Sequence, residues 1–159
     1  KRKIIQLENE EKNNLYKIRE SNDLKAKDIA TYLNVSRSNY SEWENNKTPI
    51  PTRRIIELAD FYKINIDYLL NLSPHKIEIK TPSKINLIKI GKRIKKARSE
   101  LYLTLREIGK KLNCSYSAFS AYERGENLIN SETLLSLCTL TNYSIDYILG
   151  RTNTKYLNK

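Results

Sequence analysis

Residues 26–45 carry apolar positions at the spacing of two short helices that meet at a tight corner. Ile29, Ala30 and Leu33 fall on one face of the first helix, because positions i, i+1 and i+4 lie on the same side of a 3.6-residue turn. Asn34 then occupies the corner, since asparagine is one of the few non-glycine residues that tolerate a positive φ. The pattern therefore predicts a first helix that ends at Asn34.

The second helix of this pair is expected to begin after Ser36, whose hydroxyl suits an N-cap because it can accept a free backbone N–H. Tyr40 and Trp43 would turn inward. The outward positions are Arg37, Ser38, Asn39, Ser41 and Glu42. An ordinary solvated helix face would also be polar, but these side chains are of the kinds that read base edges in the major groove. The stretch is therefore predicted to be a helix-turn-helix motif.

The same pattern returns 79 residues later without a gap. Leu24, Ile29, Leu33, Asn34, Ser36, Ser38, Ser41, Glu44, Leu58, Ile66, Asp67, Tyr68 and Leu70 recur as Leu103, Ile108, Leu112, Asn113, Ser115, Ser117, Ser120, Glu123, Leu137, Ile145, Asp146, Tyr147 and Leu149. A register held across roughly fifty residues indicates an internal duplication.

Each copy is predicted to contain five helices, which makes the fold class all-α with two such domains in tandem. Residues 1–72 form the first domain, with a charged lead-in at residues 1–10. Residues 73–84 are read as an extended linker because they contain two prolines. Residues 85–159 form the second domain and end in a polar tail.

One ion pair is predicted inside each copy. Arg19 and its counterpart Arg98 follow the apolar face of the first helix, while Glu44 and Glu123 end the second helix of the motif. We expect each arginine to pair with the glutamate of its own copy. Such a pair would act as a structural strut, because removing one member of a partly buried pair is costly.

The composition argues against an enzyme. The chain has one histidine, two cysteines and four glycines. Neither a metal site nor a catalytic triad can be assembled from them, so no cofactor or metal is expected. Cys114 and Cys138 are predicted to pack as small core residues. No apolar run approaches the roughly 18 residues of a membrane span and no signal peptide is visible, so a cytoplasmic protein without membrane contact is expected.

The charge indicates a polyanionic partner. Residues 1–79 hold 14 Lys and Arg against 12 Asp and Glu, a balance of +2, whereas residues 80–159 hold 15 against 6, a balance of +9. Basic chains attract nucleic acid through their summed field, so the second half should contribute more of that attraction.

The two copies resemble tandem lambda-repressor/Cro-like (Xre-type) helix-turn-helix domains. The first copy matches through Ile29-Ala30, Leu33-Asn34-Val35-Ser36 and Ser41-Glu42-Trp43-Glu44, and the second through Ile108-Gly109, Leu112-Asn113-Cys114-Ser115 and Ser120-Ala121-Tyr122-Glu123-Arg124-Gly125. The chain departs from the family at the start of the motif's first helix, where Ala26 and Leu105 replace a frequent glutamine. It departs also at the corner, where asparagine replaces the usual glycine.

The resemblance implies a site on double-stranded DNA. In this family the motif's second helix enters the major groove. Base-reading roles are implied for Arg37, Ser38, Asn39, Ser41 and Glu42, and in the second copy for Tyr116, Ser117, Ala118 and Ala121. Phosphate contacts are implied for Lys25, Lys27, Asn45, Lys47, Arg106 and Arg124.

A sequence-specific transcriptional regulator of a bacterium or phage, acting as a repressor, is therefore the expected function. Two recognition helices would bind as an intramolecular pseudo-dimer or within a homodimer. The alternative is an antirepressor-like or antitoxin-like interaction protein, because Tyr116, Ala118 and Ala121 could contact thymine methyl groups or another protein.

Overall fold

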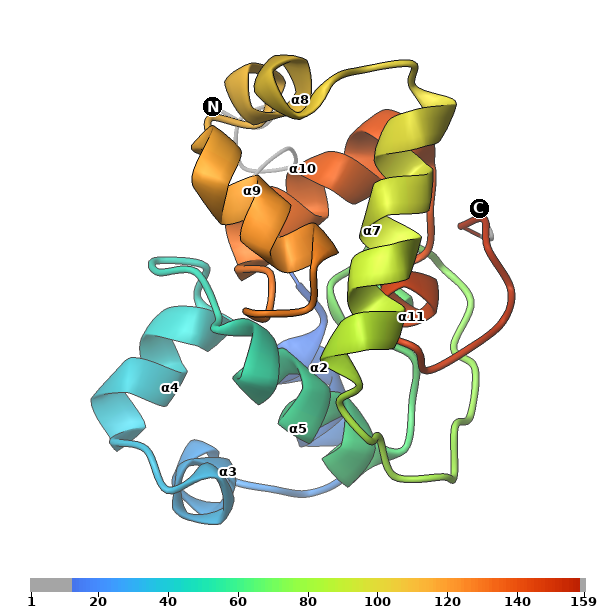
Figure 1. Ribbon diagram of the computed structural model, residues 1–159. Coiled ribbons are helices and arrows are strands. Elements are labelled where there is room, and N and C mark those ends of the chain that lie inside the picture. Colours follow the sequence, from blue (N-terminus) through green and yellow to red (C-terminus); the bar gives the residue numbers. More distant parts are fainter. Residues whose placement is uncertain (1–12, 158–159) are drawn as a thin grey trace, which may run out of the picture. The chain divides into compact units, whose positions relative to one another are not determined.

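The computed structural model describes residues 13–157 and divides the chain into two compact units between Lys80 and Thr81. Ten helices account for the regular structure of the described residues, which contain no strand beyond two isolated β-bridges (Figure 1). The predicted all-α fold class, with two helical units in tandem, is thereby confirmed. The predicted lead-in at residues 1–10 lies outside the described residues.

The described part of the first unit consists of five helices. They are α2 (Leu15–Ser21), α3 (Ala26–Leu33), α4 (Arg37–Glu44), α5 (Thr52–Tyr62) and α6 (Ile66–Leu69). Helices α3 and α4 pack against each other as the predicted helix-turn-helix pair. The fully buried side chains at the centre of the unit include Leu15, Ile29, Tyr40, Leu58 and Leu69.

The second unit repeats this order with α7 (Leu87–Glu100), α8 (Leu105–Lys111), α9 (Tyr116–Glu123), α10 (Ser131–Thr141) and α11 (Ile145–Ile148). Helices α8 to α11 each begin 79 residues after α3 to α6, so the duplication read from the sequence extends to the helix starts. The fully buried core includes Ile94, Ile108, Phe119, Leu137 and Ile148.

The corner of each motif has the expected backbone. Asn34 and Asn113 adopt left-handed conformations with φ of 55° and 52°. Ser36 and Ser115 then cap α4 and α9, because each hydroxyl accepts the backbone N–H three residues later at 3.1 Å. These caps satisfy donors that a helix start otherwise leaves unbonded, and they fix where both helices begin.

Both predicted ion pairs are confirmed. Arg19 Nη2 lies 2.9 Å from Glu44 Oε1, and Arg98 Nε lies 2.6 Å from Glu123 Oε2. Each arginine also donates to the carbonyl five residues later, at 2.9 Å and 2.8 Å. The first helix of each unit is therefore tied to the end of the motif's second helix.

Residues 73–80, assigned to the linker from the sequence, are hydrogen-bonded to the first unit. The Ile79 N–H donates to Lys63 O at 2.9 Å, and the Asn65 N–H donates to Ile77 O at 3.0 Å. In the second unit Arg151 Nε donates to Ser83 Oγ at 2.9 Å. Residues 80–82 lie between these bonds, so the tether is much shorter than the predicted linker.

The tail of the second unit makes the equivalent contacts. The Leu157 N–H donates to Asn142 O at 2.8 Å, and the Ser144 N–H donates to Lys155 O at 2.9 Å. The isolated β-bridges, Ile64 with Glu78 and Tyr143 with Tyr156, lie at the same place in the two units. The segment through residue 157 is thus part of the repeated fold.

A difference between the cores leads to a stability prediction. The hydroxyl of Tyr62 is buried without a hydrogen-bond partner among the described residues, and burial raises its pKa to about 12. The buried Tyr40 hydroxyl lies near the Glu44 carboxylate, which adds to the effect of burial in raising the pKa of Tyr40. The second unit has Thr141 and Phe119 at these positions. Because an unsatisfied buried hydroxyl costs free energy, Tyr62→Phe should raise the free energy of unfolding by about 1 kcal/mol.

Chemical denaturation of the full chain tests this, with Phe119→Tyr as a reverse change at a fully buried ring of the second unit. That variant should lose stability. A Tyr62→Phe variant less stable than wild type would contradict the prediction.

Among residues 13–157, no helix combines the length and apolar character needed to cross a membrane.

Candidate nucleic-acid interface

Helix α4 is held in the first unit by its inner face. Tyr40 is fully buried and Trp43 is 7% exposed, and their rings meet edge to face with centroids 6.5 Å apart. Glu44 fixes the end of the helix through Arg19. The opposite face is exposed and consists of Arg37, Ser38, Asn39, Ser41 and Glu42, the predicted base-reading set.

The predicted phosphate-binding residues of the first unit are also exposed, namely Lys25, Lys27, Asn45 and Lys47. Lys25 and Lys27 lie at the start of α3, where Asp28 accepts the Lys25 backbone N–H at 2.8 Å. The Asn45 amide donates to Ser41 O at 2.8 Å. Asn45 therefore closes the end of α4 in this structure, while the lysine side chains supply the positive charge beside it.

Helix α9 has the same orientation within the second unit but a different surface. Phe119 is fully buried and Tyr122 is 9% exposed. Tyr116 is 51% exposed and Ser117 is exposed, whereas Ala118 is only partly exposed. This face offers one phenol and one serine hydroxyl in place of the arginine, asparagine and glutamate of α4.

Ala121, for which a base-reading role was predicted, is buried in the second unit. Its side chain is 7% exposed. The loop after α9 returns at this point, because the Glu126 N–H donates to Ala121 O at 3.0 Å. In the first unit Lys47 makes the same backbone bond to Glu42, but the longer glutamate side chain extends past the turn and remains exposed.

Two glycines allow the helices around α9 to approach closely. A Cβ on Gly91 in α7 would lie 2.5 Å from Glu123 O, and a Cβ on Gly109 in α8 would lie 2.6 Å from Cys114 O. Both distances are shorter than real Cβ contacts allow. The glycines thus let α7 reach the end of α9 and let α8 reach the corner before it.

The two arginines assigned to phosphate in the second unit differ in their surroundings. Arg106 is exposed in the first turn of α8, and its guanidinium carbon lies 5.7 Å from the Tyr116 ring centroid. Arg124 is paired with Glu126 through two bonds of 2.8 and 3.0 Å and also donates to Ser120 Oγ. The sequence did not predict the pairing of Arg124 with Glu126, although a reversal of charge from Lys47 marks this position.

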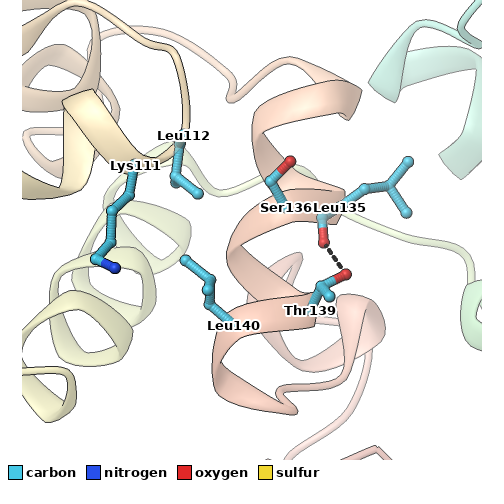
Figure 2. Close-up of a pocket in the computed structure, with 6 residues that line it drawn as sticks. All are labelled: Lys111, Leu112, Leu135, Ser136, Thr139 and Leu140. Carbon is cyan, nitrogen blue, oxygen red and sulfur yellow. Dashed lines mark hydrogen bonds between the residues drawn. The ribbon is translucent and has the colours of Figure 1, made fainter.

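A shallow pocket of about 320 Å³ lies between the end of α8 and α10 in the second unit (Figure 2). It is lined by Lys111, Leu112, Leu135, Ser136, Thr139 and Leu140. The Thr139 hydroxyl already donates to Leu135 O at 2.8 Å. The first unit has Tyr32 and Phe61 at the positions of Lys111 and Leu140, with ring centroids 4.6 Å apart. The second unit has no aromatic pair at the place where its pocket lies.

A family profile described as helix-turn-helix matches residues 15–69 and, a second time, residues 94–148. The chain belongs to this helix-turn-helix family. The two matches cover α2 to α6 of the first unit and, in the second, the region from within α7 through α11. The predicted resemblance to the Xre-type family is thereby confirmed, together with its occurrence in tandem.

Comparison with known proteins identifies similar helix-turn-helix chains. Over 70 residues the chain is 39% identical to the HTH-type transcriptional regulator ImmR of Bacillus subtilis (strain 168). That match covers 44% of this chain and 55% of ImmR, so the chain spans about half the length of this relative.

Two solved structures are also similar. The P22 c2 repressor, in complex with a synthetic operator, is 35% identical with a TM-score of 0.37 and covers 40% of this chain and 96% of its own. The clp gene regulator ClgR of Corynebacterium glutamicum is 27% identical with a TM-score of 0.38 and covers 44% of this chain and 74% of its own.

Proposed function

We propose that this helix-turn-helix chain is a sequence-specific regulator of transcription that binds double-stranded DNA and acts as a repressor. The observation that carries the proposal is the exposed polar face of α4 on a helix whose other face is locked into the core. A rigid helix with outward hydrogen-bonding side chains is what direct readout in the major groove requires.

The side chains of α4 suit specific bases. Arginine fits the O6 and N7 acceptors of guanine, asparagine fits adenine, and glutamate accepts from cytosine N4. Arg37, Asn39 and Glu42 would fill these roles, with Ser38 and Ser41 as further hydrogen-bonding groups. Lys25, Lys27 and Lys47 would neutralise phosphates on either side of the groove.

The second unit would read DNA less directly. Tyr116, Ser117 and Ala118 offer few hydrogen-bonding groups, so α9 would contact thymine methyl groups and the sugar-phosphate backbone. Arg106 is an exposed cation of the second unit beside α9. On this proposal the chain acts in the cytoplasm of a bacterium, encoded by the host or by a phage, and no catalytic step or cofactor is involved.

Base reading by α4 can be tested by two substitutions. Arg37→Ala or Asn39→Ala should cost about 1–3 kcal/mol of binding free energy on the cognate site and relax the preference at one base pair. The cognate site is first obtained by selecting bound sequences from a random duplex pool. Binding of each variant is then measured on that duplex and on its single-base variants.

Lys17→Ala is the matched control, because it removes an exposed charge from α2 without altering α4. It should leave the base preference unchanged. Equal losses of affinity on cognate and random DNA for Arg37→Ala and Asn39→Ala would instead make these residues phosphate contacts.

A further inference from the structure

The loop after α9 holds an arginine in a closed arrangement. Arg124 Nε and Nη2 donate to the two carboxylate oxygens of Glu126 at 2.8 and 3.0 Å, and Arg124 Nη1 donates to Ser120 Oγ. Both side chains of the pair remain about half exposed, at 55% and 56%. The guanidinium therefore lies at the surface with its Nε–Nη2 edge occupied by the carboxylate.

The first unit has the same backbone hydrogen bond at this place, but the side chain there carries the opposite charge. The Lys47 N–H donates to Glu42 O at 2.8 Å, as the Glu126 N–H donates to Ala121 O at 3.0 Å. The side chains of Lys47 and Glu126 thus leave the fold at equivalent points beside the helix expected to read DNA. At that point the first unit would attract a phosphate and the second would repel it.

A phosphate and the Glu126 carboxylate compete for the same donors. Arginine binds either group with two parallel hydrogen bonds, so the two modes exclude each other at one guanidinium edge. The bonds from Arg124 lower the pKa of Glu126, whose carboxylate, like any exposed glutamate, is charged at neutral pH. A phosphate brought close to Arg124 would also lie near that negative charge, and like charges oppose such a contact.

We propose that Glu126 withholds Arg124 from DNA phosphates and thereby limits the sequence-independent DNA affinity of the second unit. The inference rests on the proposed function and concerns the regulation of the same surface. The consequence of this restraint is selectivity for the specific site over random DNA. The second half carries the larger excess of basic residues, and sequence-independent attraction to phosphates supplies most non-specific binding. A restraint on one arginine next to α9 reduces the non-specific affinity without changing the side chains of α4.

The experiment uses the full chain and a fluorescent duplex of random sequence. Glu126→Gln keeps the shape of the side chain and removes its charge. We expect it to bind the duplex about three- to tenfold more tightly. The slope of log K against log salt should become more negative by about 1, as one added phosphate contact would make it. Glu132→Gln is the matched control, because it makes the same charge change on an exposed residue of α10 in the same unit.

Arg124→Ala, introduced into wild type and into Glu126→Gln, separates a restraint on Arg124 from a general charge effect. The loss of affinity should be several-fold larger in the Glu126→Gln background than in wild type, where Glu126 already holds the guanidinium. Three results would each overturn the inference: equal effects of Glu126→Gln and Glu132→Gln, weaker binding by Glu126→Gln, or the same Arg124→Ala loss in both backgrounds. Absence of DNA binding by wild type and Glu126→Gln alike at about 50 mM salt would overturn the proposed function as well.

Discussion

Replacing Glu123 by alanine should lower the free energy of unfolding of the second unit by about 3–5 kcal/mol. Glu123 and Arg98 are only 7% and 14% exposed, and they are joined by hydrogen bonds of 2.6 and 3.0 Å. The substitution would leave a mostly buried guanidinium without its counter-ion. The remaining bond to Leu103 O cannot replace that charge. Glu44→Ala should have the same effect in the first unit, where Arg19 would lose its partner.

Urea denaturation distinguishes the two units because Trp43, the chain's single tryptophan, lies in the first. Glu44→Ala should shift the fluorescence transition. Glu123→Ala should shift the circular dichroism transition of the second unit and leave the fluorescence transition in place. Such a chain is analysed with two transitions, since two domains do not unfold as one two-state system.

Two controls make the result specific to burial. Glu126→Ala breaks an exposed pair in the next loop and should change stability little, because surface ion pairs contribute little. Replacing Arg98 and Glu123 together by methionine should restore much of the stability, since apolar residues of similar size tolerate burial. A Glu123→Ala variant within about 1 kcal/mol of wild type would show that the pair is not a strut.

These ion pairs were predictable because both members belong to regular helices. The helical period fixes the direction in which Arg98 and Glu123 point, and the duplication doubles the observation through Arg19 and Glu44. The corner residues Asn34 and Asn113 were predictable for a similar reason, since few residue types suit a left-handed backbone. Local chemistry at these positions allows few alternatives.

The ends of the units were harder to predict. Residues 73–80 contain Pro74 and alternate apolar and charged side chains, which is typical of an extended connector. Their attachment to Lys63 and Asn65 combines backbone bonds with bonds of the Asn65 side chain, which accepts the Ile77 N–H at 2.8 Å and donates to His75 O at 3.0 Å. The hydrophobic pattern does not encode these bonds. The tail near Leu157 escaped prediction for the same reason. Helical periodicity reports which face is buried and gives no information about such extended pairing.

The exposure of the candidate residues was predicted well on α4 and less well on α9. The period correctly gives the outward direction of Arg37 and Asn39. It places position 121 outward too, but the short alanine side chain ends beneath the loop that returns to α9. The pairing of Arg124 with Glu126 joins two long side chains, whose rotamers the period does not determine.

The largest effect on DNA binding is expected from the exposed lysines of α7. Replacing Lys92, Lys95 and Lys96 by glutamine should make the slope of log K against log salt less negative by about 2.7, since each lost phosphate contact removes about 0.9. All three side chains are exposed on α7. Arg93 beside them is held by the carbonyls of Tyr147 and Thr152, so its charge is committed to the fold.

The matched control is a triple glutamine variant of Lys17, Lys63 and Lys76, which are exposed lysines of the first unit. It changes the net charge by the same amount. If the second unit supplies the salt-sensitive attraction and the first supplies the sequence choice, the α7 variant should lose far more affinity for random DNA. Its ratio of specific to random binding should remain near that of wild type, whereas Arg37→Ala lowers this ratio. Equal losses by the two triple variants would mean that the α7 lysines only solvate their helix, and the division of labour between the units would be wrong.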